Sequence, residues 1–157
     1  MKTLINIDSS VLQEYDDWKN ANINWDIGDY ISLKCKMNDA IAIGKLLFPN
    51  FIEKEGCIIL EFRFDEETFR EWFRLFEGDV KKVEYKCNLY EVMDYFNDRD
   101  EYDSDEAYNF AIDEFSKILK KSWEINLKIL FPDRIMNVDV FDEYDTTRIT
   151  IFTDTEG

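Results

Sequence analysis

The chain has 157 residues, with 35 acidic against 19 basic side chains and a formal net charge of −16. The length suits one domain with an ordinary core, and a hydrophobic fraction of 45% excludes a disordered acidic tail. Such a charge repels nucleic acid and anionic membranes and attracts basic proteins. We expect the chain to bind a basic protein and to bind neither nucleic acid nor a membrane. The alternative, that the charge serves solubility alone, remains open.

Histidine is absent, which removes the commonest general base and the commonest metal ligand. Cys35, Cys57 and Cys87 are a poor disulfide framework, lack the C-x-x-C spacing of zinc sites, and are expected to be small buried hydrophobes. Residues 1–8 lack the apolar region of a signal peptide, and no stretch approaches a membrane span. We expect a cytoplasmic protein that is not an enzyme and needs no cofactor and no metal.

Hydrophobic periodicity predicts the secondary structure of the first half of the chain. The elements are a strand at 2–7, a helix at 9–18, a loop at 21–29, a strand at 30–34, a helix at 37–48 and a strand at 57–64. Apolar residues at i, i+3, i+4 and i+7 from Met37 to Phe48 indicate a buried helix that Pro49 ends. In the strand predicted at 57–64, Ile58 and Leu60 share one face with Phe62 and Phe64.

The second half begins with helices and ends with strands. Asp65 and Asp79 are predicted N-caps, and Gly78 a C-terminal stop between their helices. A helical period covers 89–96, and a capping box of Asp103 and Glu106 predicts a helix over 108–121. Alternation then predicts strands at 123–131, 136–140 and 149–153. The fold class is α+β in a single domain, 1–157: an antiparallel sheet, made of a C-terminal three-strand meander plus N-terminal strands, packed with four to five helices.

Two acidic segments that carry tyrosine are the candidate partner-binding site. Tyrosine suits an interface because it buries area and keeps a polar tip. Their residues are Asp98, Asp100, Glu101, Tyr102, Asp103, Asp105, Glu106, Tyr108, Asp142, Glu143, Tyr144 and Asp145. A calcium loop starting at Asp98 would need a glycine at its sixth position, where Asp103 stands. A solvated loop that caps a helix remains the alternative for residues 98–106.

Other candidate residues favour structural roles. Cys57 lies in a core-like strand and has no histidine to activate it as a nucleophile. The aromatic stripe from Phe69 to Phe76 is typical of a helix core face. Trp18 and Trp25 lie among acids and asparagines, so either could be an exposed side chain that anchors a partner or a packing residue.

The middle of the chain resembles a set of small bacterial proteins. Its motifs are Leu-Leu-Phe-Pro at 46–49, Gly-Cys-Ile-Ile-Leu at 56–60 and Phe-Asp-Glu-Glu-Thr-Phe at 64–69 with Trp72. In size and acidity the set is similar to immunity proteins of bacterial polymorphic-toxin and contact-dependent inhibition systems. The resemblance implies a cytoplasmic antitoxin that occludes a toxin, and it carries over no catalytic residue.

These observations favour an immunity protein that binds and neutralises a cognate toxin, a basic nuclease-type effector, by covering its active site with acidic surface. Two alternatives remain open. A nucleic-acid mimic of the anti-restriction or anti-CRISPR type predicts one long acidic stripe. A carboxylate- or metal-dependent hydrolase predicts a deep pocket with several buried acids.

Overall fold

The computed structural model describes residues 1–154 and shows one α+β domain with six α-helices and two antiparallel sheets in that range, which confirms the predicted fold class. The helices are α1 Tyr15–Ala21, α2 Ile27–Lys34, α3 Met37–Leu47, α4 Glu66–Leu75, α5 Val80–Cys87 and α6 Asp105–Leu130. The strands are β1 Phe51–Lys54, β2 Cys57–Leu60, β3 Tyr90–Glu91, β4 Met136–Glu143 and β5 Thr146–Thr153.

The larger sheet has the strand order β3-β5-β4, and the smaller one is the β1-β2 hairpin. The β4-β5 hairpin pairs Met136 with Thr153 at one end and Glu143 with Thr146 at the other. The strands predicted at 136–140 and 149–153 are therefore confirmed. The third strand of this sheet is β3, which pairs Tyr90 with Ile149, so the helix predicted over 89–96 is instead a short strand followed by a 3₁₀ turn.

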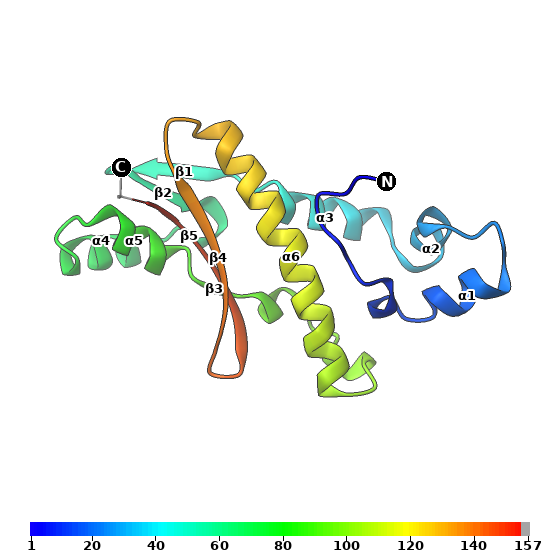
Figure 1. The fold of residues 1–157 in the computed structure, drawn as a ribbon. Coiled ribbons are helices and arrows are strands. Elements are labelled where there is room, and N and C mark those ends of the chain that lie inside the picture. Colours follow the sequence, from blue (N-terminus) through cyan, green and yellow to red (C-terminus); the bar gives the residue numbers. More distant parts are fainter. Residues whose placement is uncertain (155–157) are drawn as a thin grey trace.

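Residues 123–131 do not form the predicted strand, because α6 continues to Leu130. No proline or glycine interrupts the helix before Pro132. Trp123 and Leu127, four residues apart, are buried, whereas Ile129 is 70% exposed. Apolar residues on two faces of one helix produced the apparent alternation. Figure 1 shows α6, the longest element, running beside the β4-β5 hairpin at an angle to it.

The N-terminal predictions also need correction. Residues 2–7 form no strand; the Asp8 N–H donates to the Glu114 carboxylate at 2.9 Å, so this segment is attached to α6. Tyr30–Lys34 belong to α2, because Asp26 and Asp29 form a reciprocal capping box that starts a helix there.

The helix predicted at 37–48 exists as α3, but it is not buried. Met37 is 76% exposed, Ile41 58% and Phe48 68%. Its C-terminal end is held on α6: the Trp123 indole N–H donates to the Leu46 carbonyl at 2.9 Å, and Asn126 donates to the Leu47 carbonyl at 2.9 Å.

Helices α1 and α2 pack through aromatic rings. Tyr15 meets Tyr30 edge to face at 5.4 Å between ring centroids. Trp18 lies 5.2 Å from Trp25 and 5.7 Å from Tyr30. Both tryptophans are half-buried in this local cluster, so it accounts for them as packing residues.

Strand β2 is buried on both faces, which corrects the prediction that one face holds Ile58, Leu60, Phe62 and Phe64. Ile58 and Leu60 join the larger core, where α6 packs on the three-stranded sheet. Cys57 and Ile59 join a smaller core with Phe69 of α4. Phe62 lies beyond the strand in a 3₁₀ turn and is 48% exposed.

Two polar side chains, Glu84 of α5 and the C-cap residue Asn88, fill the space between the sheets. Asn88 accepts from the Leu60 N–H at 2.8 Å and donates to the carbonyls of Ile58 at 3.0 Å and Ile151 at 3.2 Å. Glu84 accepts from the Ile58 N–H at 2.8 Å and from the Thr153 N–H. Both side chains are fully buried. They satisfy backbone groups of β2 and β5 that have no strand partner, so α5 joins the two sheets.

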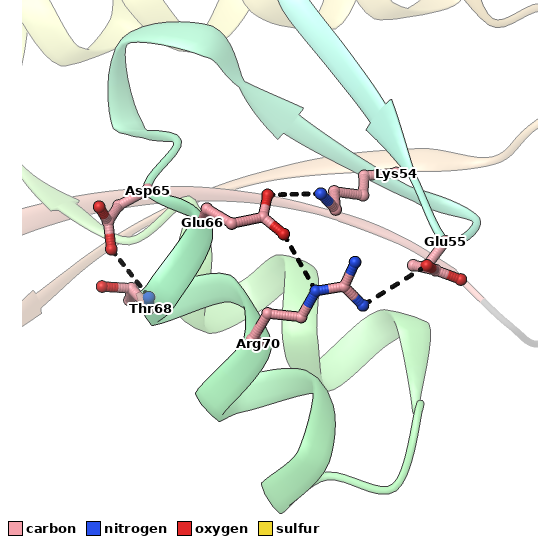
Figure 2. A network of polar contacts seen from close by, with 6 residues as sticks. All are labelled: Lys54, Glu55, Asp65, Glu66, Thr68 and Arg70. Carbon is pink, nitrogen blue, oxygen red and sulfur yellow. Dashed lines mark hydrogen bonds and ion pairs between the residues drawn. The ribbon is translucent and has the colours of Figure 1, made fainter.

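The β1-β2 hairpin is tied to α4 by the surface network in Figure 2. Glu66 accepts from Lys54 and from Arg70 Nε at 3.0 Å, and Arg70 also lies 3.5 Å from Glu55. The predicted N-caps are confirmed: Asp65 accepts from the Thr68 N–H at 2.8 Å, and Asp79 caps α5. Gly78 ends the intervening turn with φ of 76°.

The capping box predicted for Asp103 and Glu106 is wrong by one residue. Ser104 is the N-cap of α6 and accepts from the Ala107 N–H at 3.1 Å. The helix therefore begins at Asp105 and places Asp105 and Glu106 in its first turn, where carboxylates interact favourably with the helix dipole.

Candidate functional site

The two acidic segments lie at the same end of the molecule. Residues 98–106 lead into the first turn of α6, and residues 142–145 form the tip of the β4-β5 hairpin. In Figure 1 the start of α6 and the hairpin tip both lie low in the view. We call this region the acidic end.

A small cavity, the aromatic hollow, opens on one side of α6. Its volume is about 230 Å³, and its lining includes Phe96, Asp98, Tyr102, Tyr108, Phe115 and Ile118. Val11 and Leu12 line it from the N-terminal segment. Tyr102 packs edge to face on Tyr108 with 5.3 Å between their centroids. The hollow therefore combines aromatic walls with two carboxylates, those of Asp98 and Glu114.

A second, polar cavity separates α6 from the hairpin tip. This hairpin hollow of about 450 Å³ is lined by Asn109 and Asp113 of α6 and by the whole acidic tip, Asp142 to Asp145. Asp142 accepts from the Thr147 hydroxyl at 3.0 Å. Three carboxylates and a tyrosine of the tip thus face two polar side chains of the helix.

Most carboxylates at the acidic end have no cation beside them. Arg99 pairs with Asp105 at 2.8 Å, and Arg148 pairs with Glu143 at 3.2 Å. Within residues 1–154, no ion pair reaches the other acids of the two segments. They are Asp98, Asp100, Glu101, Asp103, Glu106, Asp142 and Asp145. This end therefore carries excess negative charge that a cationic surface can neutralise.

Burial and nearby carboxylates raise the pKa of three groups at the acidic end. Partial burial raises the pKa of Asp113, and the nearby Asp142 and Glu114 carboxylates raise it further. Burial and the Asp98 carboxylate raise the pKa of both Tyr102 and Tyr108. By contrast, hydrogen bonding to Lys117 lowers the pKa of Glu114 despite its burial. Of the two lining carboxylates of the aromatic hollow, Glu114 is paired with Lys117, and no ion pair within residues 1–154 reaches Asp98.

The three predicted tyrosines differ in accessibility. Tyr144 is 82% exposed at the hairpin tip, whereas Tyr108 is only 4% exposed. Tyr102 is half-buried in the wall of the aromatic hollow. The sequence did not nominate Asn109 or Asp113, although both follow the acidic run at helical spacing and so share a face of α6.

Other reactive groups are dispersed. Among residues 1–154, no cluster of three or more Cys, Asp or Glu side chains could hold a metal ion. Cys57 and Cys87 are buried, as expected, but Cys35 is exposed at the C-terminal end of α2, so the prediction of burial is wrong for Cys35. Burial raises the pKa of Cys57 to about 12 and that of Cys87 to about 11. No helix in the described part of the chain is long and apolar enough to cross a membrane.

Comparison with known proteins gives no match: no family model, no curated protein and no solved structure is significantly similar to this chain. The assignment of the candidate site therefore depends on the chemistry of its own residues.

Proposed function

We propose that this chain is an immunity protein that binds a cognate bacterial toxin with a basic surface and covers the toxin's active site with its acidic end. The observation that carries the proposal is the gathering of unpaired carboxylates from residues 98–106 and 142–145 at one end of a well-packed domain. Opposite potentials steer encounter and select the partner, and desolvated aromatic side chains add affinity.

A local patch fits occlusion of an active site better than mimicry of nucleic acid. A duplex mimic needs carboxylates that follow regularly spaced phosphates over a long face. In this chain the unpaired carboxylates of the two segments surround the first turns of α6. Residues 117–128 of the same helix carry Lys117, Lys120, Lys121 and Lys128, which interrupt any continuous acidic stripe along it.

The first test is co-expression and pull-down with the product of the gene directly upstream. We expect a stoichiometric complex, protection of cells that express the toxin, and an affinity that falls as salt rises. No complex together with no protection would refute the proposal.

Matched charge reversals locate the surface. Asp100→Lys with Asp103→Lys changes two exposed carboxylates at the acidic end, and Glu71→Lys with Asp139→Lys makes the same change in charge elsewhere. We expect the first pair to lose binding and the second to retain it, with both proteins folded by circular dichroism. Equal losses would show that net charge alone drives the association, which contradicts a defined binding surface.

A further inference from the structure

The aromatic hollow has the chemistry of a cation site. Tyr102 and Tyr108 present aromatic rings, and Phe96 and Phe115, which meet edge to face at 4.9 Å, form a second wall. Aromatic faces attract an ammonium or guanidinium group, and they do so more strongly when water is excluded. Ala111 and Ile112 supply apolar surface for an alkyl chain.

The size of the hollow limits its occupant. At about 230 Å³ it lies below the about 300–1,000 Å³ that is typical of sites for drug-sized ligands. It is open on one side to the acidic end, since residues 98 and 102 belong to that surface and also line the hollow. A single side chain projecting from a bound protein suits this volume and this position.

The charge of Asp98 has no cation beside it in residues 1–154, and its side chain accepts no hydrogen bond there. The other lining carboxylate, Glu114, is already bonded to Lys117 and to the Asp8 N–H. Arg99 lies with its guanidinium carbon 5.6 Å from the Tyr108 centroid, which shows that a ring of this cluster accommodates a cation. Arg99 pairs with Asp105, so Asp98 remains uncompensated.

We propose that the aromatic hollow takes one lysine or arginine side chain from the basic partner, with its alkyl chain against Ile112 and Phe115 and its charged group at Asp98. This inference rests on the proposed function for the identity of the partner, but the binding of an alkyl cation can be measured without one. The side chain would act as an anchor residue at the centre of the interface.

The test is a titration of the full chain with n-butylammonium and n-butylguanidinium chloride at constant ionic strength, followed by methyl NMR. n-Butanol is the neutral control. We expect saturable shifts of the Val11, Ile112 and Ile118 methyl groups with either cation and weaker binding of the alcohol. Asp98→Asn should weaken cation binding about tenfold, the effect of losing one charge-assisted contact. Glu71→Gln removes an exposed charge on α4, outside the acidic end, and should change affinity less than about twofold because of screening.

Three results would overturn the inference: no saturable shift at these methyl groups, equal affinity for n-butanol, or equal losses in Asp98→Asn and Glu71→Gln. Ala111→Leu gives an independent check, since the larger side chain fills the hollow and should block both cations. Failure of this titration leaves binding of a basic protein at the acidic surface testable by the charge reversals. Selective cation binding with no protein partner would refute only the proposed function.

Discussion

Replacement of Asn88 by alanine should destabilise the domain severely, because this one side chain satisfies three buried backbone groups. The Leu60 N–H and the carbonyls of Ile58 and Ile151 all lose their partner. Each buried polar group left unsatisfied costs about 1–3 kcal/mol. Since the space vacated by the amide can admit water to some of these groups, we expect a total loss of about 3–5 kcal/mol. Such a loss is a large part of the about 5–15 kcal/mol that stabilises a typical domain.

Urea unfolding followed by tryptophan fluorescence and far-UV circular dichroism measures this loss. Trp123 is fully buried in the larger core, so its fluorescence reports when that core becomes exposed to water. Asn20→Ala on the exposed face of α1 is the matched control and should change the free energy of unfolding by less than about 0.5 kcal/mol. A loss under about 1 kcal/mol in Asn88→Ala would refute the view that α5 joins the sheets through this amide.

Three further predictions concern charge, thiol chemistry and backbone conformation. Asp113→Asn should raise the thermal midpoint at pH 7, because the raised pKa of Asp113 means that its ionisation opposes folding above the unfolded-state pKa. The gain in thermal midpoint should vanish as the pH falls below about 3.9, the pKa of an unperturbed aspartate. A gain that stays constant with pH would contradict the raised pKa. An aromatic disulfide reagent should label Cys35 rapidly in the native protein and should reach Cys57 and Cys87 only after unfolding, as mass spectrometry would show; rapid native labelling of either would exclude their burial. Gly78→Ala should lower stability by about 1–2 kcal/mol in urea unfolding because φ is 76°, whereas Gly44→Ala, in open space on α3, should raise it by about 0.5–1 kcal/mol; equal effects would contradict the conformational argument.

The sequence predicted those elements whose signals are local. Asp65, Gly78 and Asp79 mark the ends of α4 and α5 because caps act within one turn. It misassigned residues 123–131, since five alternating apolar residues fit a strand as well as a helix with two apolar faces. What distinguishes the two is the sheet beneath α6, which a local pattern does not contain. The exposure of α3 has the same cause: periodicity defines an apolar face but not whether anything covers it.

The acidic end was partly predictable. Composition identified residues 98–106 and 142–145, and the structure adds that the first turns of α6 bring them to one end of the molecule. Asp113 and the aromatic hollow could not be predicted from the sequence, because they depend on tertiary contacts. The hollow, for example, combines α6 with residues before position 13. Glu84 and Asn88 were missed for a related reason. Polar residues four apart on a helix are typical of a solvated face, and only the unpaired edges of β2 and β5 explain their burial.

The groups that stabilise the fold are separate from those proposed to bind. In the part of the chain that the structure describes, no hydrogen bond or ion pair joins Glu84 or Asn88 to either acidic segment. Effects at sites without shared partners usually add. Asn88→Ala should therefore lower the folded fraction without changing the affinity of each folded molecule, and Asp100→Lys with Asp103→Lys should do the opposite. Combining the two should give the sum of both effects, and a strong coupling between them would mean that partner binding reaches the junction of the two sheets.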